Sequence, residues 1–191
     1  TVDHTRRLKY SQSFKNNLDE ICPPVIKKFT GKPYTKISFR PDYARLQKEG
    51  LTADEIALFK KRVYDIAAVT DKSVKVKYNG ELVPIKDFQQ YIDLYIGNKT
   101  DNKRVYEQSD SRWEYAVALS PSEEFSQVSF VNGIYTSKGG KHIEYIMNQI
   151  VKKLIAYILK KKKVEVKSTT IKEQIMLFLR CDIETVSYTH L

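Results

Sequence analysis

The order of apolar and polar residues predicts strands in the first part of the chain. Residues 8–14 alternate loosely, and the Cys22-Pro23-Pro24 run breaks this pattern before the segment VIKKF at residues 25–29. Residues 34–40 alternate strictly, which is typical of a half-buried strand. Pro41 ends this run because proline cannot donate a hydrogen bond to a strand ladder.

Apolar residues at helical spacing predict four helices. Residues 51–70 form the first, opened by Thr52 and Glu55 at the spacing of a capping box, and residues 87–96 form a short second one. The longest apolar stripe runs over residues 143–158. A short helix is expected last, capped by Thr170 and Glu173.

The remaining elements are strands. Residues 74–85 indicate a hairpin because Asn79-Gly80 supplies a turn with positive φ angles. Further strands are expected at residues 104–108, 111–119, 126–136 and 176–184. This irregular succession of strands and helices indicates an α+β fold, in two units divided near residues 70–73.

Composition narrows the class of protein. Hydrophobic residues make up 41% and aromatic residues 12% of the 191 residues, which excludes a disordered chain. No apolar run is long enough for a membrane-spanning helix, so no membrane partner is expected. Cys22 and Cys181 show no CxxC spacing and fit a reducing compartment.

The net charge of +10 is concentrated in one segment. Residues 138–172 contain ten lysines and two glutamates, so 10 − 2 = +8 lies there. Such a patch is typical of contact with a polyanion, most often nucleic acid, although a solvated surface has the same composition. Within it, Lys160 to Lys163 exceed what a helix end requires and favour an exposed loop able to touch phosphates.

The sequence gives little evidence for a catalytic site or a metal site. The three histidines have no partners at metal-ligand spacing, and neither a nucleophile elbow nor the GxxxxGK[ST] phosphate loop occurs. SKGGKH, residues 137–142, allows two interpretations. Adjacent glycines before a helix can expose amides to phosphate, but they also turn a chain sharply, and the local residues favour the corner.

Several motifs resemble one family. SFVNGIYTSKGGKHIEYIMNQIVKKL, KPYTKISFRPD, RVYDIAAVTDKSVKVKYNGELVPIKDF and RWEYAVALS are similar to type IIA DNA topoisomerases of the eukaryotic and large-virus branch. The resemblance covers residues 1–184. It implies an ATP-hydrolysing isomerase that passes one DNA duplex through another and acts as a homodimer on double-stranded DNA.

The resemblance also implies a layout. Residues 1–70 would be the C-terminal part of a Bergerat (GHKL) ATPase domain, and residues 71–184 an incomplete transducer domain of ribosomal-protein-like fold. This fold has a left-handed βαβ crossover, against the usual right-handed rule. Residues 185–191 do not match and are interpreted as an artefact of the sequence.

Three sets of positions carry over from the family. Thr35 matches the threonine that closes the adenine pocket, although by itself it indicates only a strand threonine. Lys160, Lys161, Lys162 and Lys163 match a lysine-rich loop that approaches DNA. The transducer signature, to which we assign a shaping role and no catalysis, consists of Asn132, Thr136, Lys138, Gly139, Gly140 and His142.

Other functional parts of the family are missing from the sequence. The Mg²⁺-binding residues, the nucleotide lid, the switch lysine and the cleavage tyrosine have no match, so ATP and Mg²⁺ would bind fully only in the intact enzyme and the fragment alone would be inactive. Alternatives are a gyrase B-like or mismatch-repair-like ATPase, or a non-enzymatic nucleic-acid-binding module. The resemblance would fit a protein in the nucleus of a eukaryotic host, or a viral protein in the host cytoplasm. It would not fit a secreted protein.

Overall fold

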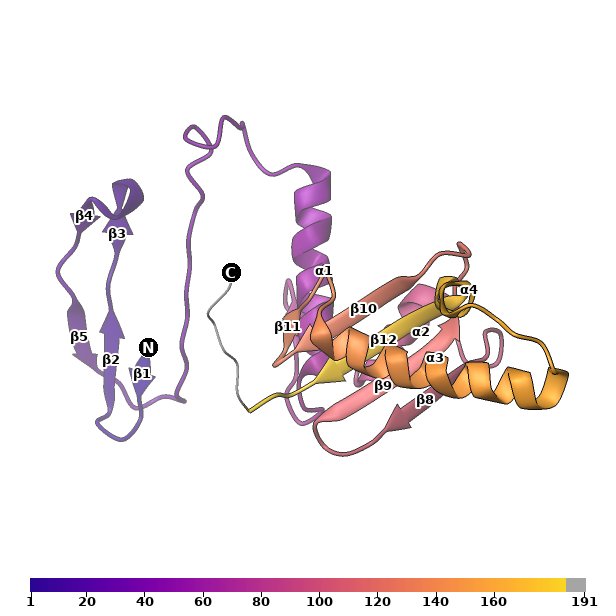
Figure 1. Cartoon of the computed structure of the whole chain (residues 1–191). Helices are drawn as coiled ribbons and strands as arrows, with labels where there is room; N and C mark the ends of the chain where they lie inside the picture. The colour runs from indigo at the N-terminus through magenta and orange to yellow at the C-terminus, as the bar shows by residue number, and fades with distance from the viewer. Residues whose placement is uncertain (185–191) are drawn as a thin grey trace. The chain divides into compact units, whose positions relative to one another are not determined.

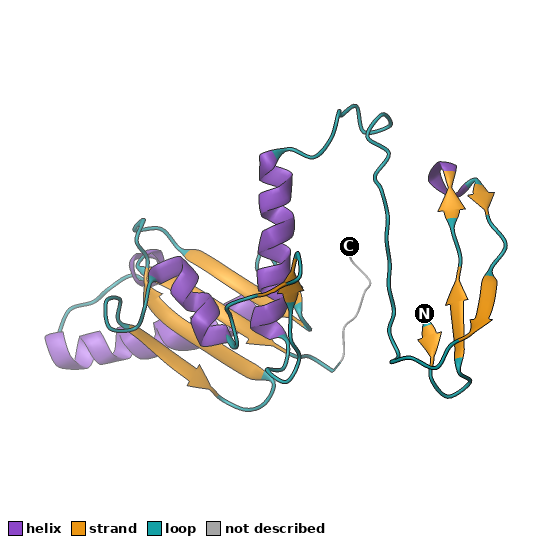
Figure 2. Ribbon diagram, turned by 180° about the vertical axis from the view of Figure 1, so that it is seen from behind, coloured by secondary structure: helices purple, strands orange, loops and turns teal. Residues whose placement is uncertain are grey.

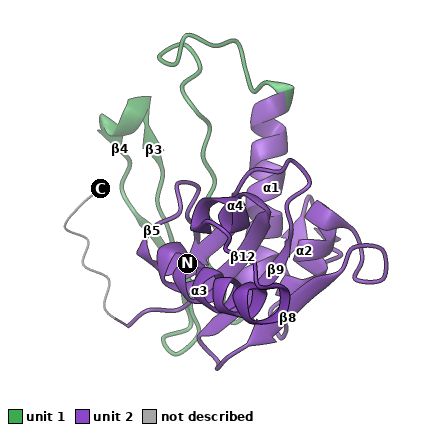
Figure 3. Ribbon diagram, turned by 45° about the vertical axis from the view of Figure 1, so that its right-hand side comes forward, with its two compact units in different colours: residues 1–53 green, residues 54–191 purple. Residues whose placement is uncertain are grey.

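The computed structural model describes residues 1–184 and divides into two compact units (Figure 3). The first unit ends at Ala53 and the second begins at Asp54. The division therefore lies at the start of helix α1 (Ala53–Val69), earlier than the predicted boundary near residues 70–73. The reason is that Ala67 and Ala68 of α1 belong to the core of the second unit. The predicted non-matching tail, residues 185–191, lies outside the described residues.

The first unit is built from short antiparallel strands. Strands β1 (Val2–Asp3), β2 (Leu8–Ser11) and β5 (Val25–Lys28) pair in the order β1-β2-β5. A 3₁₀ turn (Asn16–Leu18) joins β3 (Phe14–Lys15) to β4 (Glu20–Ile21) in a separate hairpin. The strand predicted over residues 8–14 is therefore divided between β2 and β3, which lie in different sheets, and the segment at residues 25–29 forms β5.

The strand predicted at residues 34–40 does not form a ladder in the described part of the chain. This segment is extended, and Val2 N donates a main-chain hydrogen bond to Tyr34 O at 2.9 Å. Ile37 and Phe39 are both 83% exposed, so the apolar face of the alternation is uncovered. The alternation correctly predicted an extended segment with one apolar face. A strand also needs a hydrogen-bonded neighbouring strand, which the alternation does not show.

A five-stranded sheet forms the centre of the second unit (Figure 1). Its order is β11-β10-β12-β9-β8, with β10 parallel to β12 and the other pairs antiparallel. The strands are β8 (Arg104–Gln108), β9 (Trp113–Leu119), β10 (Ser126–Val131), β11 (Ile134–Tyr135) and β12 (Ile175–Cys181). The predicted hairpin is also present as β6 (Lys77–Tyr78) and β7 (Glu81–Leu82).

Central strand β12 divides two cores between the two faces of the sheet. Met176 and Phe178 belong to a cluster with residues of α1 and of helix α2 (Phe88–Ile96). Leu177 and Leu179 point the other way, into a cluster with helix α3 (Lys141–Lys162). Figures 1 and 2 show α3 on one face of the sheet and α2 on the other. Burial on both faces explains why this strand is almost entirely apolar.

The connection from β10 to β12 is a left-handed crossover, as the resemblance implied. The chain leaves β10, passes through β11, α3 and helix α4 (Ser168–Glu173), and returns as the parallel strand β12 next to β10. In Figure 1, α3 lies in front of the sheet, the parallel strands run to the left, and β12 lies below β10. This is the rare hand for such a connection.

Three predicted elements differ in detail from the structure. The strand expected over residues 126–136 is a hairpin, because Asn132 and Gly133 take φ angles of 49° and 77° and turn the chain. The short helix α4 is preceded by Lys167, and Thr170 lies inside it. The lysines at residues 160–162 belong to the last turn of α3, where a loop was expected.

Candidate nucleic-acid interface

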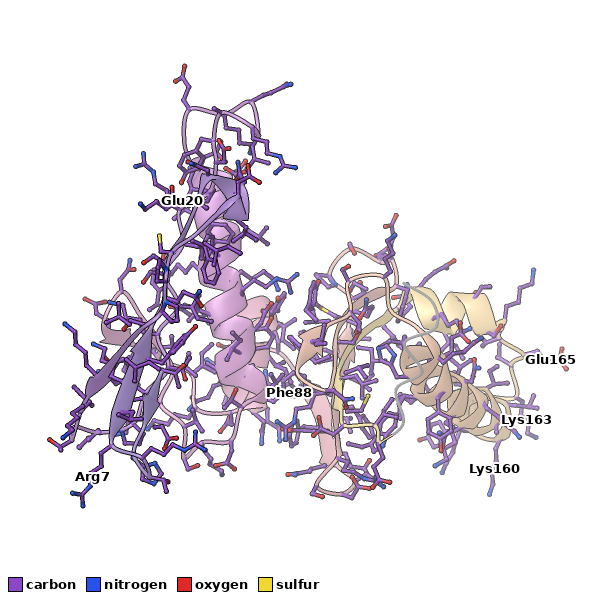
Figure 4. The ribbon with its side chains drawn as sticks, turned by 90° about the vertical axis from the view of Figure 1, so that its left-hand side faces the viewer. Arg7, Glu20, Phe88, Lys160, Lys163 and Glu165 are labelled. Atoms are coloured by element: carbon purple, nitrogen blue, oxygen red, sulfur yellow. The ribbon has the colours of Figure 1, made fainter. Side chains whose placement is uncertain are left out.

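Four consecutive lysines mark the end of α3. Lys160, Lys161 and Lys162 form its last turn, and Lys163 terminates the helix in a left-handed conformation with φ 56°. The Lys163 amide donates to the carbonyl of Leu159 at 3.0 Å, which closes the helix. All four side chains are exposed and no ion pair links them to the described carboxylates, so their charges face solvent. Figure 4 shows this for Lys160 and Lys163.

The surroundings of this tip add to its positive charge. Residues 145–172 contain eight lysines and one carboxylate, Glu165, which also points to solvent (Figure 4). Three lysines at the negative end of a helix dipole are individually favourable, but neighbouring like charges repel one another. A row of phosphates would relieve this repulsion, and lysine suits such contacts because it makes no demand on base sequence.

The glycine pair of the signature forms the corner between β11 and α3. Gly139 has φ +71° and Gly140, the residue before the helix, has φ +148°. A Cβ on Gly140 would lie 3.1 Å from the His142 ring, so a larger residue would be both strained and crowded. The Gly139 amide already donates to the carbonyl of Thr136 at 3.0 Å. This use within the fold supports a structural corner over a phosphate loop.

Thr136 and His142 meet in a small polar network under this corner. The Thr136 hydroxyl lies 3.1 Å from His142 Nε2 and 2.5 Å from the Ser129 hydroxyl. Ser129 lies in turn 3.2 Å from His142 Nε2. Burial lowers the pKa of His142, because the charged imidazolium would lose hydration. The network ties β10, the segment after β11 and the start of α3 together.

Asn132 makes a second connection, at the turn between β10 and β11. Its side-chain amide donates to the carbonyl of Ile183 at 3.1 Å, and its side-chain oxygen accepts from the Ile183 amide at 2.7 Å. The side chain thus continues the ladder that its own main-chain amide makes with Cys181 O at 2.9 Å. Lys138, in contrast, is exposed and has no hydrogen bond within residues 1–184.

Thr35 lies in the first unit, in the extended segment after β5. Its side chain is exposed, and its hydroxyl is 3.5 Å from that of Thr1. Thr35 lines neither the depression formed by residues 48–52 nor the one beside His4 and Arg7. Residues 1–184 contain no group of three or more metal-ligating side chains, and none of their helices is long and apolar enough to cross a bilayer.

Sequence reasoning missed the polar residues that hold α1 to the sheet. Arg180 pairs with Glu114 at 2.5 Å and donates to the carbonyl of Val69, at the end of α1, at 3.3 Å. Buried Asp65 accepts a 2.6 Å hydrogen bond from the hydroxyl of Tyr91 on α2. An arginine inside the apolar run of β12 was the available signal, since a charge there requires a partner.

Comparison with known proteins gives a consistent answer. The model of the family described as DNA gyrase B matches residues 86–189, more than half of the chain. DNA topoisomerase 2-beta of Cricetulus longicaudatus is 39% identical over 94% of this chain, and DNA topoisomerase 2 of Arabidopsis thaliana is 39% identical over 98% of it. The chain spans only 11% and 13% of these two relatives.

Solved structures agree with the sequence comparisons. The ATPase region of Saccharomyces cerevisiae topoisomerase II superposes with a TM-score of 0.84 at 38% identity, covering 94% of this chain and 46% of that one. The ATPase and transducer domains of Balamuthia mandrillaris topoisomerase II superpose with a TM-score of 0.80 at 30% identity, with the same two coverages. The chain therefore belongs to the DNA gyrase B family of type II DNA topoisomerases and corresponds to part of their ATPase and transducer region.

Proposed function

We propose that the chain is the part of an ATP-dependent type II DNA topoisomerase that relays the nucleotide state to the DNA and contacts the DNA backbone. The basic tip of α3, residues 160–163, would make that contact. The single observation that carries this assignment is a run of four exposed lysines without carboxylate partners in the described structure. The similarity to the ATPase region of a topoisomerase II supports the nucleotide side.

The relay would run through α1 and the sheet of the second unit. Arg180 and Asp65 attach the C-terminal half of α1 to β12 and to α2. A displacement of this helix would therefore move the sheet, and the sheet carries α3 with its lysines. Packed interfaces of this kind transmit such movements because they shift between discrete arrangements and do not deform continuously.

We propose that ATP and Mg²⁺ bind fully only in the intact protein. The similarity to the ATPase region of a topoisomerase II supports nucleotide binding there, and Thr35, which is exposed, offers one hydroxyl. We assign Thr35 to the edge of an adenine pocket that other parts of the enzyme complete. We also propose that the residues that cleave DNA lie in another part of the intact protein. We place the intact protein as a homodimer on double-stranded DNA in the nucleus, or in a virus-infected cytoplasm.

A salt titration of DNA binding tests the lysine tip. The logarithm of the DNA association constant falls linearly with the logarithm of the salt concentration, and removing one phosphate contact should make this slope shallower by about 0.9. We expect replacement of Lys160–Lys163 by alanine to make the slope shallower by roughly 2 to 4 and to weaken binding to all duplex sequences alike. Lys75, Lys77, Lys99 and Lys103, four exposed lysines elsewhere in the second unit, supply the charge-matched control. A tip variant that binds like this control would refute the assignment.

A further inference from the structure

The positive charge of α3 continues from its tip along one side of the helix. Residues four positions apart on a helix are separated by about 40° around its axis, and residues seven positions apart by about 20°. Four exposed residues of α3 therefore share one side, within about 100°. We call them the α3 stripe, and they are Lys152, Lys153, Ala156 and Lys160.

The opposite side of α3 fixes the helix to the sheet. Ile143, Met147 and Val151 are buried in the cluster between α3 and the sheet. This cluster and the second core cluster both lie within the second unit, residues 54–191. The packing of α3 therefore depends on residues that the unit itself contains, and this packing directs the stripe away from the core.

No described carboxylate neutralises the stripe. Within residues 1–184, its three lysines make no ion pair and no side-chain hydrogen bond. Glu144, near the start of the helix, already accepts from Lys141 at 2.9 Å. Residues 145–164 contain no aspartate or glutamate. The exposed side of a helix usually mixes charges of both signs, so a stripe of one sign favours an external anion.

The length of the stripe indicates an extended polyanion. From Lys152 to Lys163, a rise of 1.5 Å per residue gives about 16 Å. One strand of DNA carries a phosphate about every 3.4 Å along the axis, so this length passes about four or five phosphates. A single nucleotide would need donors that converge on one point. A membrane surface would take up the apolar side of a basic helix, and that side of α3 is buried.

We propose that α3 lies along the backbone of duplex DNA, so that Lys152, Lys153 and Lys160 continue the contact that begins at the tip. This rests on the proposed function, because the tip would be one end of the same surface. It adds an orientation. Contact at the tip alone lets a duplex approach at many angles, whereas a row of charges holds the backbone nearly parallel to the helix. Ala156 suits this arrangement because its small side chain leaves room between the lysines.

The experiment measures binding of the full chain to a fluorescent duplex of about 30 base pairs at several salt concentrations. K152A/K153A should make the salt slope shallower by about 1 to 2, since each lost phosphate contact changes it by about 0.9. Alanine is the best helix former, so α3 should stay intact. The control K99A/K103A removes two exposed lysines between α2 and β8 and should change the slope by less than about 0.5. Equal slopes for the two double variants would refute the proposal.

The alanine variant of the tip, Lys160–Lys163, separates this proposal from the proposed function. If the tip variant makes the slope shallower and K152A/K153A does not, the proposal is wrong and the proposed function stands. If neither variant changes the slope, both are wrong. If only K152A/K153A does, the stripe is supported and the contact at the tip is refuted.

Acetylation of the unmodified chain gives a second readout that needs no variant. At low salt, duplex DNA should protect Lys152 and Lys153 from acetylation and leave the labelling of Lys99 unchanged. Equal labelling of the two stripe lysines with and without DNA would overturn the proposal. Vesicles of equal parts phosphatidylcholine and phosphatidylserine test the other anionic surface. Protection by these vesicles without protection by DNA would also overturn it.

Discussion

The side chain of His142 stabilises the Gly139-Gly140 corner between β11 and α3. It is 9% exposed, and its Nε2 lies within 3.2 Å of the hydroxyls of Thr136 and Ser129. Both hydroxyls can accept or donate, so Nε2 of the neutral ring has a hydrogen-bond partner without a charged group beside it. His142 is therefore a structural histidine, and its protonation destabilises the folded state.

The first prediction concerns the pH dependence of stability. Burial lowers the pKa of His142 in the folded state below its ordinary 6.5. Below pH 6.5 the unfolded chain binds a proton that the folded chain resists, so stability is lost as the pH falls from about 6.5 toward the lower folded value. Denaturant unfolding between about pH 5 and 8 should show this loss, and H142Q should flatten it. A variant with an unchanged pH profile would contradict the prediction.

Helix α3 has two functional parts, although it is continuous. Its first half buries Ile143, Met147 and Val151 against the sheet. Its last turns expose Tyr157 and Leu159 to 60% and 47% and carry the lysines. Packing therefore anchors one end and presents the other, which is how a rigid element can position a charged tip.

The second prediction tests this division along α3. V151D places an unpaired carboxylate where the side chain is 4% exposed, and we expect it to cost several kcal/mol and to abolish cooperative unfolding of the second unit. I150D, at a half-buried position, should cost less. Y157D should change stability by about 0.5 kcal/mol or less. Thermal melts followed by circular dichroism give the order, and equal effects of V151D and Y157D would contradict it.

At the scale of the whole molecule, the two units differ in how completely they are built. Both core clusters come entirely from the second unit, from Val63 to Leu179. The first unit contributes one apolar residue to the buried set, Val2, and leaves Ile37 and Phe39 exposed. Stability therefore resides in the second unit, and the first relies on neighbours that residues 1–53 do not include.

The third prediction follows from this asymmetry. A chain of residues 54–191 should fold alone, because it retains every residue of both cores. Its melting temperature should match the main transition of the full chain within about 4 °C, the shift that roughly 1 kcal/mol would cause. Residues 1–53 alone should show little cooperative melting. A large loss of stability on removing residues 1–53 would contradict this account.

The sequence by itself determined the main elements and the family. Periodicity located α1, α2, α3 and the hairpin of β6 and β7, because burial of one face imposes a repeat that is visible in the sequence. The specific motif around Gly139-Gly140 identified the topoisomerase resemblance and, through it, the left-handed crossover. Local patterns alone would have suggested the opposite hand, since the handedness rule is a general tendency.

Only the tertiary structure decided which residues meet. The bond from Arg180 to the end of α1, the hydrogen bonds of Asn132 with Ile183 and the pairing of Lys9 with Lys27 join positions distant in the chain. It also showed that residues 34–40 lack a strand partner among the described residues and that three of the four tip lysines are helical. The physical reason is the same in each case: a periodic pattern records that a side chain is buried or exposed, whereas a hydrogen bond, an ion pair or a strand ladder depends on which second segment is brought beside it.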